Sequence, residues 1–187
     1  AHKEKRTVLT EVESKELLSQ AGIPVVETKL AKTKKDAVRF SGLLGFPIVL
    51  KVTSPDIAHK SDSGGVKLGI RNEAQVNKAF DDIMEAIRVK SPKARIHGVA
   101  VQKMVTPGLE LVVGVTRDPQ FGPVIMFGLG GVLVEILKDV SLRIVPLTKR
   151  DATQMIQEIR GYPLLQGYRN HEPVDIAAVE DVILKLS

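Results

Sequence analysis

The stretch Lys51-Val-Thr-Ser-Pro-Asp-Ile-Ala-His59-Lys60-Ser-Asp-Ser-Gly64-Gly65-Val66 decides how the rest of this sequence is interpreted. The apolar run before it, residues 46–50, predicts a buried strand that ends on Lys51. After the glycine pair, residues 66–70 predict a second strand. The stretch is therefore expected to form a hairpin whose loop presents His59 together with Lys60, Ser61, Asp62 and Ser63.

The residue types in this hairpin suit an anionic ligand. Glycine has no side chain, so Gly64 and Gly65 can bend the backbone sharply and aim N–H groups at an oxyanion. The imidazole of His59 can accept a phosphoryl group as well as act as a base. In a partly desolvated cleft, the Lys51 ammonium attracts a phosphate strongly. Together these features are typical of a phosphate-handling hairpin.

Simpler interpretations of the same residues stay open. His59 could be an ordinary surface histidine bonded to a neighbour, and Lys51 could extend to solvent from the strand end. A metal role for His59 is disfavoured, because no second histidine or cysteine lies at ligand spacing. The segment is not a Walker A loop, and no G-x-G-x-x-G opens a helix, so neither of those nucleotide sites is supported.

Composition disfavours several classes of protein. The 187 residues suffice for one domain, or for two small lobes that share a cleft. The absence of cysteine rules out a disulfide framework and a thiolate zinc site, and it fits the cytoplasm, where we expect this protein. No apolar run approaches the ~18 residues of a membrane span. The net charge of +5 is dispersed and aromatic residues are only 4%, so no nucleic-acid partner is expected.

Alternating elements predict an α+β fold. Helices are expected to start at the capping residues Thr10, Thr33 and Asn72, and to cover 149–160 and 175–187. Besides the hairpin, strands are expected over 24–31, 96–105, 109–116, 123–128, 132–137 and 142–146. The later strands suggest an antiparallel sheet in a second lobe. The last helical pattern still runs at Ser187, so we expect that the natural sequence continues beyond it.

Two carboxylates lie within apolar runs of the second half. Glu110 lies in the run from Pro107 to Gly114, and Glu135 follows the glycine-rich segment 128–131. A carboxylate in such a setting needs a hydroxyl, a cation or a metal as partner. Each signal is weak alone, because each run could equally be a plain strand of the sheet.

Four segments, taken in order, resemble the β subunit, or β-type domain, of the nucleoside-diphosphate-forming acyl-CoA synthetases, which belong to the ATP-grasp superfamily. The resemblance extends from about Glu11 to Ser187. Its segments are Glu13-Ser-Lys-Glu-Leu-Leu with Gly22-Ile-Pro-Val, Gly45-Phe-Pro-Ile-Val-Leu-Lys51-Val, His59-Lys-Ser-Asp-Ser-Gly-Gly-Val66, and Asp118-Pro-Gln-Phe-Gly-Pro with Phe127-Gly-Leu-Gly-Gly.

The resemblance implies an ATP-grasp fold, in which two α/β lobes have a nucleotide cleft between them. Residues 1–10 would be an N-terminal extension, residues 11–95 the first lobe with the histidine loop, and residues 96–187 the second lobe. The family continues past this last helix into an acidic-x-Asn-Pro motif and a later aspartate, which supply the magnesium ligands. We therefore expect those ligands beyond residue 187, since Glu135 and Asp139 are poor substitutes.

The family interconverts acyl-CoA, ADP and phosphate with the free acid, CoA and ATP, so the resemblance implies an ADP-forming acid–CoA ligase that uses ATP/ADP and Mg²⁺. His59 would be the catalytic phosphoryl carrier. Nucleotide contacts would come from Lys51 on the phosphates, from Glu110 near the ribose and phosphates, and from the backbone of 102–104 at the adenine. The full set of expected nucleotide-binding residues is Lys51, Ser61, Gly64, Gly65, Val66, Gln102, Lys103, Met104 and Glu110.

The resemblance also implies a partner, an α-type CoA-binding subunit or domain that brings the acyl-CoA, in a hetero-oligomer. The competing hypothesis is a catalytically inactive ligand-sensing ATP-grasp module of a protein acetyltransferase; a degenerate copy of that kind would be expected to lose His59, which this chain keeps. A third hypothesis is an ATP-grasp ligase that joins a carboxylate to an amine. The sequence leaves open the acyl acid, the choice of ADP or GDP, and whether the α part is fused.

Overall fold

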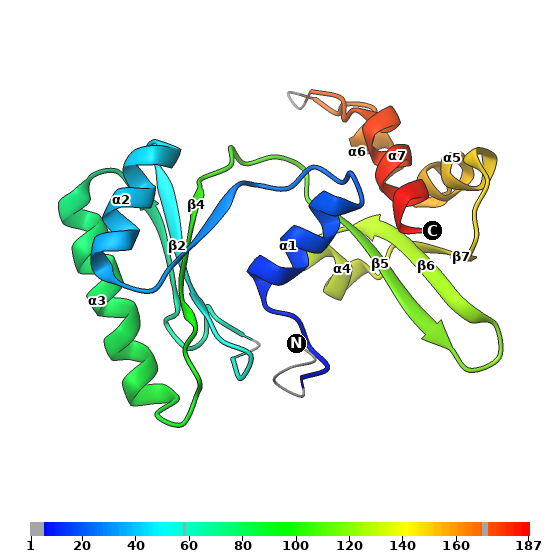
Figure 1. Ribbon diagram of the computed structural model, residues 1–187. Helices are drawn as coiled ribbons and strands as arrows, with labels where there is room; N and C mark the ends of the chain where they lie inside the picture. Colours follow the sequence, from blue (N-terminus) through cyan, green and yellow to red (C-terminus); the bar gives the residue numbers. More distant parts are fainter. Residues whose placement is uncertain (1–5, 58, 170–171) are drawn as a thin grey trace. The chain divides into compact units, whose positions relative to one another are not determined.

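The computed structural model describes residues 6–57, 59–169 and 172–187. Of the expected N-terminal extension, residues 1–5 lie outside the described part. The chain forms two compact units, Ala1–Thr106 and Pro107–Ser187, and Figure 1 follows the elements in sequence order. No described helix combines the length and the apolar character that crossing a membrane requires.

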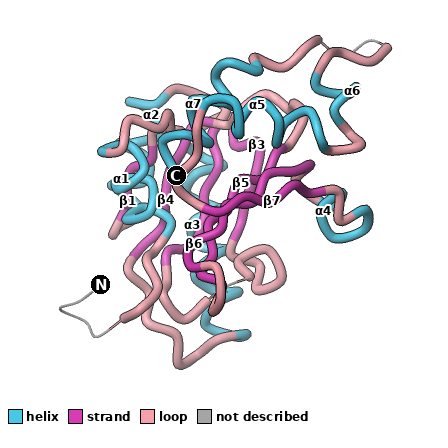
Figure 2. Tube along the Cα trace, turned by 90° about the vertical axis from the view of Figure 1, so that its right-hand side faces the viewer, coloured by secondary structure: helices cyan, strands magenta, loops and turns pink. Residues whose placement is uncertain are grey.

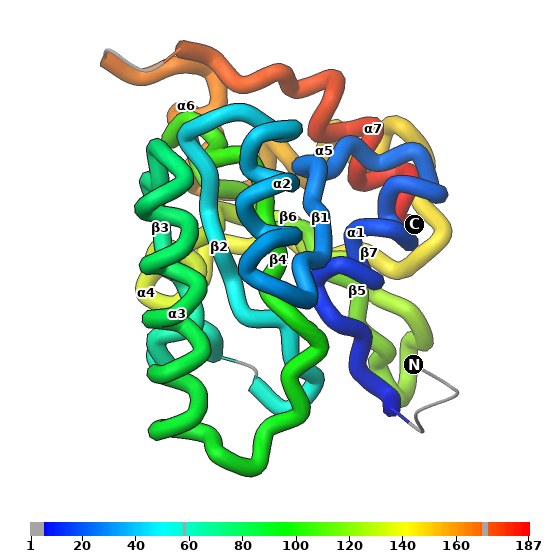
Figure 3. Tube along the Cα trace, turned by 60° about the vertical axis from the view of Figure 1, so that its left-hand side comes forward, coloured from blue at the N-terminus to red at the C-terminus, as the bar shows by residue number. Residues whose placement is uncertain are grey.

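The first unit is built on a four-stranded antiparallel sheet. The strands lie in the order β1-β4-β2-β3. Their bounds are β1 Thr28–Ala31, β2 Ile48–Thr53, β3 Val66–Ile70 and β4 Gly98–Lys103. Helices α2 (Lys34–Leu44) and α3 (Glu73–Lys90) cover one face of this sheet, as Figure 3 shows, while α1 (Glu11–Gln20) packs near β1.

Local capping signals start the helices where the sequence predicts. Thr10 and Thr33 each form a capping box with the acidic residue three positions later, and the Asn72 side chain accepts a hydrogen bond from the Gln75 amide. These side chains satisfy amide groups that a helix leaves unpaired in its first turn. The three predicted helix starts in the first unit are confirmed.

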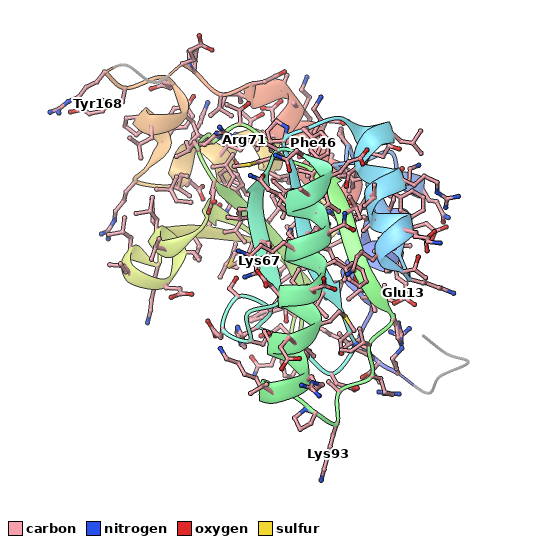
Figure 4. The ribbon with its side chains drawn as sticks, turned by 90° about the vertical axis from the view of Figure 1, so that its left-hand side faces the viewer. Glu13, Phe46, Lys67, Arg71, Lys93 and Tyr168 are labelled. Atoms are coloured by element: carbon pink, nitrogen blue, oxygen red, sulfur yellow. The ribbon has the colours of Figure 1, made fainter. Side chains whose placement is uncertain are left out.

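The core of the first unit lies between the sheet and helices α2 and α3. Ile48, Leu50 and Val52 of β2 are fully buried there, together with Val76 and Ile83 of α3. Residues alternate between the two faces of a strand, so Lys51 belongs to the opposite face. Figure 4 labels Lys67 of β3, whose side chain lies toward α3, and its ammonium is 3.6 Å from the carboxylate of Asp82.

The second unit has a three-stranded antiparallel sheet in the order β5-β6-β7. The strands are β5 Leu111–Asp118, β6 Gly122–Leu129 and β7 Val140–Ile144, and Figure 2 shows them in magenta. The helices are α4 Val132–Leu137, α5 Lys149–Glu158, α6 Tyr162–Leu165 and α7 Ile176–Leu186. Helices α5 and α7 bury Phe127 and its neighbours in β6, which makes a second hydrophobic core.

One predicted strand is wrong. Residues 132–137 form helix α4, not a strand, because β6 ends at Leu129 and Gly131 turns the backbone with a φ of 58°. A short apolar run fits a buried strand and a helix equally well by periodicity. Helix α6 was not expected at all, since its four residues are too few to show a period.

The first sheet takes a strand that the sequence placed in the second lobe. Residues 96–105 were expected in the later sheet, but β4 pairs with β1 and β2 over its length. The structural division accordingly follows Thr106 and not residue 95. Sequence order misled the prediction, because a strand that returns to the middle of an earlier sheet carries no local signal of its partner.

Candidate functional site

The predicted hairpin is present, and it places Lys51 at its end. Lys51 of β2 lies directly opposite Val66 of β3 in the antiparallel register. The Lys51 side chain is 26% exposed, on the sheet face opposite to α2 and α3. Strand, cation and return strand follow in the predicted order, but β2 continues to Thr53 along β4 and does not end on Lys51 as predicted.

The His59 loop, residues 59–65, is a compact turn held by its own backbone. The Gly65 amide donates to the Lys60 carbonyl at 2.7 Å, and the Gly64 amide donates to the Ser61 carbonyl at 3.0 Å. Gly64 has a φ of 75°, a conformation that favours glycine. A Cβ atom at Gly65 would collide with Val52. Both glycine amides are thus engaged within the turn in this conformation, so they do not point at an oxyanion as the sequence suggested.

A cluster of charges lies beside this loop, and we call Glu11, Lys15, Lys51 and Lys60 the Glu11 cluster. The Lys15 and Lys51 ammonium groups lie 3.0 and 3.1 Å from Oε1 of Glu11. The Lys60 ammonium lies 3.3 Å from Oε2 of the same carboxylate. Three cations share one anion, so the cluster has a surplus of two positive charges (three lysines minus one glutamate).

The cluster is tied to the far end of β4. The Lys15 ammonium donates to Oε1 of Gln102 at 2.6 Å and to Oγ1 of Thr28 at 2.9 Å. Burial raises the pKa of Glu11, but hydrogen bonds and charges from Lys15 and Lys51 outweigh it and lower the pKa to about 2. Glu11 is therefore ionised at neutral pH, and the site is cationic overall.

The other predicted residues of the first unit lie near this cluster to different degrees. His59 and Ser61 are exposed in the loop, and Gln102 is buried with its side chain bonded to Lys15. Lys103 is exposed. The Met104 amide donates to the Pro47 carbonyl at 3.0 Å, so that N–H group is already occupied.

Glu110 lies in the second unit, before β5. Its carbonyl accepts from the Gly130 amide at 2.7 Å, and its carboxylate lies against Gly131 so closely that a side chain there would collide with it. Because the exposed Glu110 side chain can move aside, the φ of 58° is the stronger reason for a glycine at 131. Contacts of Glu11 and Lys15 connect Lys51, the His59 loop and Gln102 within the first unit. Glu110 lies in the second unit and has no part in these contacts.

A metal site is not evident among residues 6–57, 59–169 and 172–187, where no three histidine or acidic side chains gather closely enough to hold an ion. Asp139 accepts hydrogen bonds from the amides of Arg160 and Gly161 at 2.8 and 2.7 Å. That carboxylate ties β7 to the turn before α6, and Glu135 is exposed on α4. The described residues thus do not fit a bound Mg²⁺ by themselves.

Sequence analysis missed Glu11 and Lys15. An acidic residue in the first turn of a helix is common, because it interacts favourably with the helix dipole. Glutamate and lysine four residues apart are equally ordinary on a helix surface. Neither the first-turn position nor the four-residue spacing distinguishes Glu11 and Lys15 from an ordinary solvent-exposed pair. The residues that make the difference, Lys51 and Lys60, are distant in the sequence.

Comparison with known proteins gives consistent matches. A family model described as an ATP-grasp domain matches residues 1–187. The acetate–CoA ligase [ADP-forming] I subunit beta of Pyrococcus furiosus is 52% identical over 95% of this chain and 77% of its own length.

Two solved structures from Ca. Korarchaeum cryptofilum are similar over 99% of this chain. The dinucleotide-forming acetyl-coenzyme A synthetase 1 with coenzyme A and Ca-AMPCP is 49% identical, with a TM-score of 0.96 over 81% of that chain. A second structure of that enzyme holds coenzyme A and Mg-AMPPCP, with its phosphohistidine segment pointing towards the nucleotide binding site. It is 46% identical, with a TM-score of 0.86 over 79% of that chain.

Proposed function

Because this chain belongs to the ATP-grasp β subunits of the ADP-forming acyl-CoA ligases, we propose that it relays a phosphoryl group through His59 to a bound nucleoside diphosphate. The ATP-grasp fold and the family resemblance are confirmed by the similarity to the solved synthetases. In the reversible reaction, acyl-CoA, ADP and phosphate become the free acid, CoA and ATP. A CoA-binding α-type partner completes the enzyme as a hetero-oligomer.

The observation that carries this proposal is the Glu11 cluster beside the His59 loop. A surplus of two positive charges at the loop that carries the exposed His59 suits a site through which phosphates pass. In phosphoryl transfer the protein mainly positions the groups and stabilises charge on the phosphoryl oxygens. A related synthetase was solved with its phosphohistidine segment pointing towards the nucleotide binding site, which supports a relay through histidine in this family.

The relay has two balanced steps. First, a lone pair of the His59 imidazole attacks the phosphorus of a phosphohistidine on the partner, a new P–N bond forms, and the donor nitrogen keeps the electrons of the bond that breaks. A β-phosphate oxygen of ADP then attacks the same phosphorus, and His59 leaves as neutral imidazole. Splitting the transfer lets the phosphoryl group cross a distance that one step cannot span.

In this proposal Lys51 binds nucleotide phosphates, and Ser61, Gly64, Gly65 and Val66 line their path. The backbone of residues 102–104 faces the adenine, and Glu110 lies near the ribose. Since the Met104 amide bonds to Pro47, the adenine contact would fall to the other backbone groups of that segment or require this bond to open. Magnesium, when bound with the nucleotide, would neutralise phosphate charge.

The decisive variant is His59→Ala in the full-length protein with its CoA-binding partner. We expect it to abolish ATP formation from acyl-CoA while the Kd for ADP stays within about threefold. Wild-type protein incubated with labelled ATP and magnesium should form an acid-labile, base-stable phosphoprotein that H59A lacks. Asp62→Asn, an exposed position of the same loop, is the control and should retain turnover. Unchanged turnover in H59A would remove His59 from the relay.

Lys51→Met tests the nucleotide contact separately. Loss of a charge-assisted contact should weaken ADP binding by about 1–3 kcal/mol, measured by calorimetry. Lys67→Met is the matched control, because Lys67 belongs to the same hairpin but pairs with Asp82 on the helix-covered face. Equal ADP affinity for K51M and wild type would place Lys51 outside the nucleotide site.

A further inference from the structure

Glu11 has no role in the function proposed above, yet it is the centre of the cationic cluster. Its Oε1 contacts the ammonium groups of Lys15 and Lys51, and its Oε2 contacts that of Lys60. One carboxylate therefore joins helix α1, strand β2 and the His59 loop. We propose that Glu11 is a positioning residue for phosphoryl transfer, which fixes Lys60, and through it His59, relative to Lys51. This inference rests on the proposed relay and adds a residue to it.

Lys60 is the point through which Glu11 can control the loop. Lys60 follows His59 directly, and its carbonyl accepts from the Gly65 amide at 2.7 Å and from the Ser63 hydroxyl at 2.8 Å. The backbone of residue 60 is thus the main attachment of the turn, while its side chain is held by Glu11. His59, whose carbonyl accepts from the Ser63 amide at 3.4 Å and from the Ser63 hydroxyl at 3.3 Å, is therefore linked through Lys60 to Glu11.

Glu11 is itself held in place. It occupies the first position of α1, directly after the Thr10 capping box. Helix α1 has no fully buried side chain, and Glu11 and Lys15 both bind polar groups outside the helix. Lys15, one turn later, reaches Gln102 and Thr28 on the sheet. The helix therefore presents its carboxylate from a position that the sheet fixes independently of the loop.

This arrangement differs from an ordinary surface ion pair. Glu85 and Arg88 are 60% and 76% exposed and form one isolated pair, a kind of contact that contributes little. In the Glu11 cluster every side chain is between 19% and 26% exposed, and three cations converge. Without the carboxylate the ammonium groups would repel one another and separate. With it they stay together and still attract phosphate, because the surplus charge remains positive.

The test uses the full-length protein with its CoA-binding partner and compares four variants. Glu11→Gln keeps the shape but removes the charge, and Glu11→Asp keeps the charge. Glu16→Gln, an exposed position of the same helix, is the matched control, and H59A reports on the relay itself. For each we measure kcat for ATP formation from acyl-CoA and the Kd for ADP by calorimetry.

We expect E11Q to lower kcat by about fivefold or more with the Kd for ADP within about threefold, because positioning acts on the transfer step and not on ground-state binding. E11D should recover part of the loss, and E16Q should match wild type. A smaller fall in kcat, or an equal loss in ADP affinity, overturns the inference. If H59A keeps its turnover, the proposed relay through His59 is wrong. If H59A loses turnover and E11Q keeps it, the relay stands and Glu11 has no part in the relay.

A second variant covers the case in which E11Q fails to fold. Lys60→Met breaks the same link from the loop side and should reproduce the fall in kcat. When E11Q does fold, a double-mutant cycle adds a further test: E11Q with K60M should lose no more than the worse single variant, because both changes remove one connection. Independent, multiplying losses would overturn the inference.

Discussion

The sheet face opposite to α2 and α3 in the first unit and the sheet face opposite to α5 and α7 in the second unit carry different kinds of side chain. In the first unit that face holds Lys51, and α1 lies against it with Glu11, whose one carboxylate is shared by Lys15, Lys51 and Lys60. In the second unit the corresponding face is apolar, with Leu142 and Ile144 each 54% exposed and Phe121 60% exposed. The four side chains of the charged cluster all come from the first unit, and a half-buried ionic group depends on such partners. Apolar side chains do not need a specific partner, and the apolar face of the second sheet has an open pocket of about 630 Å³.

The largest expected effect separates the two faces of the second sheet. Phe127 is fully buried between β6 and the helices, whereas Leu142 of β7 is on the open face. Phe127→Ala should cost about 3–5 kcal/mol of unfolding free energy, because it removes apolar contacts and leaves a cavity. Leu142→Ala should change it by about 0.5 kcal/mol or less. Urea unfolding of the full chain measures both, and equal losses would show that the open face is packed as tightly as the core.

The same contrast explains what the sequence could and could not predict. The hairpin and the capped helices depend on contacts between residues no more than about twenty positions apart in the sequence. Thr10, Thr33 and the glycine pair are local signals that predict them directly. The resemblance assigns roles to His59 and Lys51 from a contiguous motif, and those roles stay predictions. The attachment of β4 to the first sheet, and of Glu11 to Lys51, depends on long-range contacts that no local pattern encodes.

Acid should weaken the Glu11 cluster in a defined window. The pKa of Glu11 is about 2 in the folded chain, against 4.5 for a free glutamate. A lowered folded pKa means that the contribution to stability is present above pH 4.5 and is lost as the pH falls towards 2. The difference corresponds to about 3 kcal/mol at most. The stability gap between wild type and E11Q should therefore shrink between pH 6 and pH 3, in unfolding curves recorded at each pH, while E16Q shows no such change. A gap that is constant with pH would mean that Glu11 is not held by Lys15, Lys51 and Lys60.

The His59 loop should tolerate no side chain at its last glycine. A Cβ at Gly65 would collide with Val52 and come within 3.1 Å of the Lys60 carbonyl. Gly65→Ala should therefore cost about 1–3 kcal/mol through overpacking and displace Lys60. Gly42→Ala is the control, since Gly42 lies in α2 with open space around it, and it should stabilise the chain by about 0.5–1 kcal/mol. If G65A matched G42A in thermal unfolding, the loop would have to be looser than its hydrogen bonds indicate.

The smallest effect concerns the capping box that begins α1. The Thr10 hydroxyl accepts from the Glu13 amide at 3.4 Å, and Glu13 Oε2 accepts from the Thr10 amide at 2.7 Å. Thr33 and Asp36 form the same box at the start of α2. Thr10→Ala and Thr33→Ala should each cost about 1 kcal/mol of stability, because each loses the hydrogen bond of one N-cap side chain. Only Thr10 immediately precedes Glu11, so T10A should also lower kcat of the full-length enzyme with its partner, and T33A should not. Equal kcat values for the two variants, at matched losses in melting temperature, would show that the start of α1 can shift without disturbing the charged face of the first sheet.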